Sequence, residues 1–238
     1  MATKKKVSFG KENAEESQEI VKAAESVVAT AADVEAPQFG IAGDVDESDI
    51  IRPSLKLVHG VGDLAEHFDP GELVFNKEVA LERPVQLSFL AGKKEWVENV
   101  EYGGDQIARI FQNEREAHAE GLTTQWGADS TPPDCFPRLT TVVAIESETE
   151  HPGFMFEYDG KYIALAEFIM QKSAYNRAGK LVMTAAQHTY AKRGGLPRGL
   201  WSLDTAKTKA GKNVIQVPVL RGVGQNSDEK VEFLKSLI

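Results

Sequence analysis

The chain has 238 residues, a formal net charge of -9 and 42% hydrophobic residues, which is ordinary for a globular protein. Its one cysteine, Cys135, excludes an internal disulfide and leaves too few thiolates for a zinc ribbon or an iron–sulfur site. No run of about 18 apolar residues exists, and the lysines near the N-terminus are not followed by an apolar core. We therefore expect a cytosolic protein without a secretory signal or a membrane span.

Charge is divided unevenly along the chain. Residues 161–221, called the basic zone below, hold eleven Lys and Arg against two acids, a net charge of +9. The remaining residues therefore carry -18. Such a division bears on partners, because a concentrated basic surface attracts polyanions. The eleven cations are Lys161, Lys172, Arg177, Lys180, Lys192, Arg193, Arg198, Lys207, Lys209, Lys212 and Arg221.

Residues 1–49 have a polar, net acidic composition with only a weak apolar stripe. A segment of this kind cannot bury enough apolar area to offset chain entropy, so we expect a mostly disordered arm with a transient helix near 12–32. The simplest role is a solubilising tail. Competition with a ligand of the basic zone, and binding to a protein partner, are alternatives. Residues 50–238 are predicted to form a single domain.

The first half of the predicted domain contains short strands. An extended segment near Ile50 leads to a Pro-Gly turn at 70–71 and a strand at 72–75. Residues 85–90 show the period of two that marks a half-buried strand, and a glycine turn then leads to a strand at 95–97. In this alternation Val85, Leu87 and Phe89 share the core face, with Gln86 and Ser88 on the other face.

A helix is predicted at 106–121. Its apolar residues Ile107, Ile110, Phe111 and Ala117 share one helical face, and Gly121 is a suitable end. The proline-rich segment 123–139 follows as a loop.

The second half begins with two long strands, 139–147 and 154–168, the second interrupted by an Asp-Gly hairpin turn at 159–160. The segment 163–180 begins as a strand and continues toward a helix. Another strand pair surrounds the turn 209–212. The C-terminus predicts a short helix capped by Ser227, with acids in its first turn.

These elements predict a β-rich α+β fold. The expected form is a small barrel or curved antiparallel sheet with one or two helices, and an oligonucleotide-binding barrel is one candidate. An irregular sandwich is the alternative.

Motifs for catalysis and for cofactors are missing from the sequence. AGK occurs at 178–180 and 210–212, without the first glycine or the following Ser or Thr of a phosphate-binding loop. GVG at 60–62 and 222–224 lacks the third glycine of a dinucleotide fingerprint. Cys135 lies between prolines, whereas a catalytic thiolate needs a neighbouring base. We expect no catalytic residue, no metal site and no cofactor.

The basic zone also contains aromatic residues, a combination that is typical of single-strand nucleic-acid binding. Tyr162, Phe168 and Trp201 lie in apolar stretches that favour the core. Tyr175 and Tyr190 have polar neighbours and are predicted to be exposed, where their rings would stack on bases. Cations in predicted loops would bind phosphates. The predicted nucleic-acid-binding residues are Lys172, Tyr175, Arg177, Lys180, Tyr190, Lys192, Arg193 and Arg198.

The stretch IIRPSLKLVHGVGDLAEHFDPGELVFN resembles the opening of a loosely defined group of tailed-bacteriophage proteins. That group has an I-P-x-L-x-L-x-Q opening, a PG-x-hydrophobic-x-N turn and a strand ending in a Trp-Glu-like pair, here GKKEWVE. A polar and basic stretch follows where QKSAYNRAGK stands. The resemblance runs from Ile50 to Tyr190, and Arg52-Pro53 and His59 depart from it. It implies a phage origin, the cytoplasm of a bacterial host and a role near DNA replication or recombination.

Three functional hypotheses follow. The leading one is a non-enzymatic protein that binds single-stranded DNA or RNA without strong sequence preference. The second is a phage structural or host-interaction protein whose basic zone contacts an acidic protein surface, or its own acidic part in a homo-oligomer. The third is an enzyme with an unfamiliar site in the loop 129–138, which would place Cys135 beside His118 or His151.

Overall fold

The computed structural model describes residues 52–100, 106–210 and 213–238, so the predicted arm and its transient helix lie outside the described residues. Within these residues ten strands form one sheet, in the order β10-β9-β4-β6-β8-β1-β2-β3, with β5 paired to β4 and β7 to β8. The strands are β1 (Ser54–Leu57), β2 (Leu73–Phe75), β3 (Val79–Leu81), β4 (Val85–Glu98), β5 (Ile110–Phe111), β6 (Cys135–Ser147), β7 (Phe156–Tyr158), β8 (Lys161–Gln171), β9 (Gly199–Ala210) and β10 (Asn213–Gln225).

Helical turns fill the connections. The longest run is continuous from residue 172 to residue 189 and is called helix 172–189 below. It consists of α3 (Lys172–Ala174), η3 (Tyr175–Gly179), α4 (Lys180–Thr184) and η4 (Ala185–Thr189). The other helical elements are η2 (Asp63–Glu66), α2 (Glu114–Ala119), η5 (Leu196–Arg198) and α5 (Asp228–Lys235).

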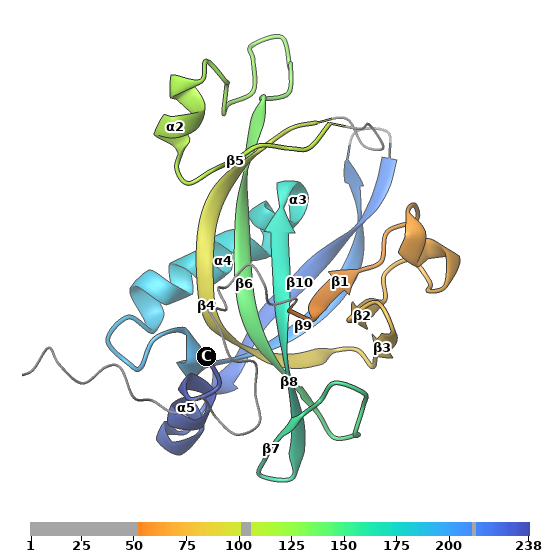
Figure 1. Ribbon diagram of the computed structural model, residues 1–238, viewed down its shortest axis with the longest axis vertical. Coiled ribbons are helices and arrows are strands. Elements are labelled where there is room, and N and C mark those ends of the chain that lie inside the picture. Colours follow the sequence, from red (N-terminus) through yellow and green to blue (C-terminus); the bar gives the residue numbers. More distant parts are fainter. Residues whose placement is uncertain (1–51, 101–105, 211–212) are drawn as a thin grey trace, which may run out of the picture. The chain divides into compact units, whose positions relative to one another are not determined.

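The sheet curls into a barrel-like half-shell, which confirms the predicted β-rich class and the curved, mainly antiparallel sheet (Figure 1). Its centre is the antiparallel set of β4, β6 and β8, which is long enough to bend through the whole height of the domain. The predicted hairpin at 159–160 joins β7 to β8. The predicted pair around 209–212 is β9 and β10.

The two ends of the sheet are joined by side chains rather than by strand pairing. Thr205 Oγ1 on β9 donates to the carbonyl of Gly71 at 2.7 Å, and Gln216 Nε2 on β10 donates to the carbonyl of Pro70 at 3.1 Å. The predicted Pro-Gly turn therefore holds the β1–β3 end of the sheet against β9 and β10. The bond from Thr205 gives the carbonyl of the buried Gly71 a partner, which a buried carbonyl needs.

The main core lies on the concave side of the sheet. Leu87 and Phe89 of β4 pack with Val143 of β6 and Phe168 of β8, and helix 172–189 covers them (Figure 1). β8 passes directly into this helix, as the sequence predicts. The turn between them is sharp because Lys172 has the left-handed φ of 51°.

On the convex side α5 packs its buried Leu234 against Leu90, Ala144 and Ile163. Ser227 caps this helix as predicted, accepting from the backbone N–H of Lys230 at 3.2 Å. Ser88 lies on the face opposite to Leu87 and Phe89, as predicted, but that face is covered at this position. Ser88 is buried and its hydroxyl accepts from Asn226 Nδ2 at 2.8 Å, because α5 and the segment before it cover this face.

Two predicted elements in the first half were wrong. There is no turn at Gly92, because continuous pairing with β6 carries β4 from Val85 to Glu98 as one strand. The predicted helix 106–121 begins only at Glu114, capped by Asn113, and is preceded by β5. Ile107 is 89% exposed, so the apolar spacing that indicated a longer helix does not mark a buried face. Pairing of β5 with β4 overrides it.

Candidate nucleic-acid interface

Helix 172–189 has one buried side and one exposed side. Tyr175, Ala178, Val182 and Ala185 face the core, which leaves Arg177 and Lys180 exposed on the other side. Two stretches of the helix, η3 and η4, have π-helical hydrogen bonding, a wider winding that is often found at functional sites. At about 1.5 Å per residue its 18 residues extend for roughly 27 Å.

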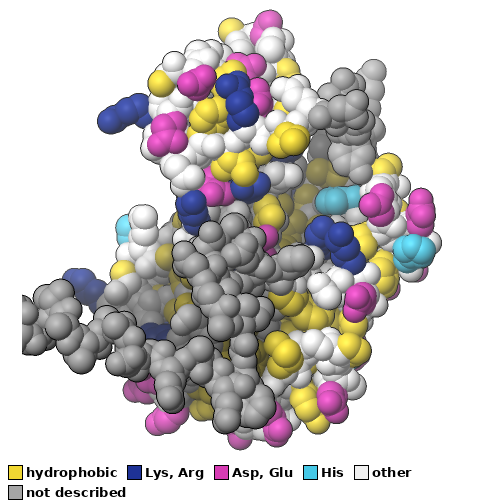
Figure 2. Space-filling model, in the orientation of Figure 1, with side chains coloured by type: hydrophobic (Ala, Val, Ile, Leu, Met, Phe, Trp, Pro, Cys, Tyr) yellow, Lys and Arg dark blue, Asp and Glu magenta, His cyan; other side chains and the backbone are white. Residues whose placement is uncertain are grey.

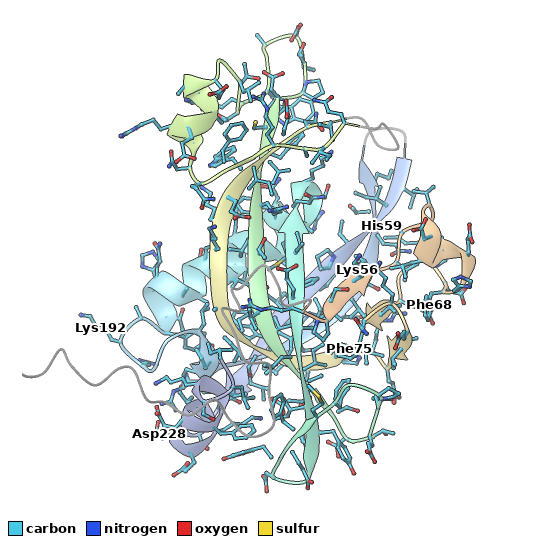
Figure 3. All side chains as sticks on the ribbon, viewed as in Figure 1. Lys56, His59, Phe68, Phe75, Lys192 and Asp228 are labelled. Carbon is cyan, nitrogen blue, oxygen red and sulfur yellow. The ribbon has the colours of Figure 1, made fainter. Side chains whose placement is uncertain are left out.

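Five of the eight predicted residues are exposed cations on this helix and on the loop that follows it. We define the basic ridge as Lys172, Arg177, Lys180, Lys192 and Arg193, all exposed. No acid lies between its members in the sequence, because the chain has no Asp or Glu between Glu167 and Asp204. Lys192 lies on the side of the domain opposite to Lys56 (Figure 3).

Local contacts orient the first part of the ridge without neutralising it. Lys172 Nζ donates to Asn99 Oδ1 at 3.0 Å and lies 5.0 Å from the centre of the Phe136 ring. Arg177 Nη2 donates to Thr208 Oγ1 at 3.4 Å, which brings the ridge next to β9. Two further exposed cations of the basic zone, Lys207 and Lys209, lie on that part of β9. Neutral partners hold these side chains while their charges stay available to an anion.

The predicted exposure of Tyr175 and Tyr190 was wrong. Tyr175 is 4% exposed and Tyr190 is 6% exposed, and both belong to the main core. Their polar neighbours in the sequence are misleading, because the helical period turns those neighbours outward and the rings inward. Burial raises the pKa of the Tyr175 hydroxyl. Neither ring is available to stack on a base.

Tyr190 is packed especially tightly. Its ring lies edge-on to Trp201, with the ring centres 6.4 Å apart, and Trp201 in turn contacts Phe89. A Cβ added to Gly199 would lie 2.5 Å from Trp201 Nε1 and 2.8 Å from Tyr190 Cε2. Glycine is therefore needed at 199 for space. Phe168 and Trp201 are core residues, and Tyr162, which the sequence also assigned to the core, is partly buried against it.

Arg198, the remaining predicted residue, holds the fold together. Its guanidinium donates to the carbonyl of Arg193 through Nε at 2.8 Å and to the carbonyl of Asn226 through Nη1 at 2.8 Å, and it pairs with Asp228 on α5. The side chain is only 18% exposed. These contacts occupy its donors, so the prediction that Arg198 binds phosphate is not supported by its geometry.

We expect Arg198→Ala to lower the free energy of unfolding by about 2 kcal/mol, because two charge-assisted hydrogen bonds disappear and a buried carbonyl loses its donor. Denaturant titration followed by tryptophan fluorescence measures this loss. Arg193→Ala is the matched control, since its exposed side chain should change stability by less than about 0.5 kcal/mol. Equal stability of the two variants would contradict the structural role of Arg198.

A groove begins beside Lys172 that the sequence did not reveal. It has a volume of about 580 Å³ and lies where β1, the end of β8, the start of helix 172–189 and β10 meet. Its walls are mainly apolar, with Leu55, Ile169, Ile215 and Pro218 among them. In Figure 2 a hollow lined by apolar side chains adjoins basic and histidine side chains. The groove joins three segments that are distant in the sequence, 54–59, 167–174 and 215–218, and no local motif signals it.

Lys56 and His59 lie close together on the β1 side of the groove (Figure 3). Desolvation lowers the pKa of the His59 imidazole, which favours the neutral form of the ring. Lys56 is exposed and, like Lys172, lines the groove. Two cations that are more than 100 residues apart in the sequence therefore border one apolar groove.

The loop 129–138 does not form the reactive site of the third hypothesis. Cys135 is fully buried and packs with Trp96, Phe111 and Ala117. Burial raises the pKa of its thiol, and the negative charges of Glu98 and Asp134 raise it further. This is opposite to the activation that a nucleophilic thiolate requires. His118 Nε2 is hydrogen-bonded to Thr124 Oγ1 at 2.8 Å, and His151 packs on Phe154.

We expect Cys135 to react with Ellman's reagent at pH 8 at least about 1,000-fold more slowly in the native protein than in guanidinium chloride. The reason is that reaction requires local opening of a packed cluster. The release of nitrothiobenzoate over time measures the rate. Full reaction of the native protein within seconds would show that the thiol is accessible.

Comparison with known proteins adds no further constraint: no protein-family model, no curated protein and no solved structure matches the chain. In the described parts of the chain, no helix has both the length and the hydropathy needed to cross a membrane.

Proposed function

We propose that this is a non-enzymatic protein that binds single-stranded nucleic acid, of the kind tailed phages use in DNA replication or recombination. The observation that carries the proposal is the basic ridge: five exposed cations on one helix and the loop after it, without an acid between them in the sequence. Such a ridge can follow a phosphate backbone, and each phosphate it neutralises releases a counterion.

The groove beside Lys172 favours a single strand over a duplex. A duplex hides the faces of its bases, whereas the bases of a single strand can turn toward an apolar surface. Because the rings of Tyr175 and Tyr190 are buried, the affinity has to come mainly from phosphate contacts. Binding should therefore depend weakly on base sequence and strongly on salt.

Fluorescence anisotropy of a labelled 30-mer of single-stranded DNA tests this function. The full-length protein should bind the 30-mer, and its affinity should decrease as NaCl is raised from 50 to 200 mM. Unlabelled single strand should compete more strongly than unlabelled duplex. Absence of binding at 50 mM NaCl would rule out the proposed function. Equal competition by duplex would leave a polyanion-binding surface without the preference for single strands.

The burial of Tyr175 and Tyr190 also supports a second function, binding to an acidic protein surface. A basic ridge without exposed rings also suits an acidic protein surface, as a phage structural or host-interaction protein would use, or the acidic part of another copy. Light scattering after size exclusion at 50 and 500 mM NaCl distinguishes self-association: an oligomer at low salt that dissociates at high salt would support it. A monomer at both salt concentrations would argue against it.

A further inference from the structure

We propose that the apolar groove beside the basic ridge receives an unpaired nucleobase of the bound strand, with the flanking phosphates held by Lys56 and Lys172. This inference rests on the proposed function and adds the site at which the strand is recognised as single. It places the base contact on residues from β1, β8 and β10 instead of the two tyrosines that the sequence indicated.

The shape and lining of the groove suit a flat apolar ring. Its volume of about 580 Å³ lies within the roughly 300–1,000 Å³ that small-molecule sites occupy. Ile169 is 42% exposed, and Ile215 and Pro218 on β10 line the groove with it. Bases removed from a stack are held between aromatic or apolar side chains in this way.

The charges at the groove fit the backbone of the same strand. Lys56 on β1 and Lys172 at the start of helix 172–189 both line the groove, and both are exposed. A base between them would place its neighbouring phosphates near these side chains. The Lys172 ammonium, which contacts Asn99 and Phe136, would turn toward its phosphate on binding. Lys172 also begins the basic ridge, so a strand in the groove can continue along Arg177 and Lys180.

Polar groups at the groove can recognise the edge of a base. Glu167, a carboxylate, lines the groove, and a carboxylate accepts hydrogen bonds from the exocyclic amine of a base such as cytosine. Gln171 is exposed at the same groove and provides both a donor and an acceptor. A carboxylate would repel a bare phosphate, so its presence favours a base over a phosphate inside the groove, with phosphates outside.

Abasic DNA separates the base contact from the phosphate contacts. An intact 12-mer of deoxycytidine and a 12-mer in which every base is replaced by hydrogen, on the same sugar-phosphate backbone, carry equal charge. We expect the full-length protein to bind the intact 12-mer about tenfold more tightly at 100 mM NaCl, because only the intact strand can bury a base against the apolar side chains of the groove. Anisotropy with end-labelled strands measures both affinities.

Two variants assign the difference to the groove. Ile169→Ser removes an apolar wall and should bring the ratio of intact to abasic affinity close to one, while leaving abasic binding unchanged. Ile110→Ser is the matched control, because Ile110 is 49% exposed and lies on β5, outside the groove. This control should keep the wild-type ratio, and thermal melting verifies that both variants fold.

The outcomes of the two proposals are distinguishable. If neither strand binds, the proposed function itself fails. If the wild-type protein binds both strands with equal affinity, the ridge binds phosphates and the base-binding groove is refuted. If the ratio of intact to abasic affinity survives Ile169→Ser, or is lost in Ile110→Ser, the base binds elsewhere and the assignment is overturned.

Discussion

Replacing Arg177, Lys192 and Arg193 together by alanine should weaken single-stranded DNA binding about 100-fold at 0.1 M salt. Each phosphate contact on a single strand contributes about 0.7 to the slope of log affinity against log salt concentration. Losing three contacts should therefore make that slope shallower by about 2. The three side chains are exposed and the variant should fold normally, because none of them holds the core. Anisotropy titrations at 50, 100 and 200 mM NaCl measure the slope.

A matched triple variant controls for net charge. It replaces three exposed cations outside the basic ridge: Lys77 in the turn after β2, Arg115 on α2 and Lys235 on α5. Their replacement by alanine changes the charge of the protein by the same amount. It should leave the salt slope within about 0.5 of the wild-type value, because no direct phosphate contact is lost. Equal salt slopes for the two triple variants would show that the basic ridge does not contact the DNA.

Tyr190→Ala should destabilise the protein by about 3–5 kcal/mol and lower its melting temperature by roughly 10 °C. The ring is buried against Trp201 in the main core, so its removal leaves a cavity that the curled sheet cannot fill. At a temperature where the variant is folded, its salt slope for single-stranded DNA should equal that of the wild type. Differential scanning calorimetry and anisotropy measure the two quantities.

Trp126→Ala is the control for Tyr190→Ala. Trp126 is 63% exposed, so its loss should change the free energy of unfolding by less than about 0.5 kcal/mol. A Tyr190→Ala protein with unchanged stability and weaker DNA binding would restore the base-stacking role that the sequence suggested. Loss of stability without a change in binding would confirm Tyr190 as a core residue.

Periodic patterns predicted much of the fold because their signals are local. The Asp-Gly turn before β8, the Ser227 cap of α5 and the passage of β8 into a helix each depend on residues within one or two turns of one another. The glycine turn at Gly92 and the helix from Ile107 failed for the opposite reason. There, pairing of β4 with β6 and β5 decides the conformation, and these partners are distant in the sequence.

The candidate site divides in the same way. The acid-free basic stretch is a property of composition, and Arg177, Lys180, Lys192 and Arg193 are exposed as loop-like or helix-surface cations should be. The prediction that the two tyrosines are exposed failed because polar neighbours in the sequence do not distinguish an exposed position from a buried one. Arg198 looked like the other cations, yet its carbonyl partners come from the loop before it and from the segment after β10.

The sequence by itself determined the β-rich class of this protein, the uneven charge and the position of the basic stretch, because composition and short-range periodicity carry these properties. Only the tertiary structure decided which side of helix 172–189 faces solvent, which arginine is consumed by the fold and where an apolar groove lies beside the ridge. These features depend on contacts between β1, β8, β9 and β10, and the curl of the sheet brings those segments together.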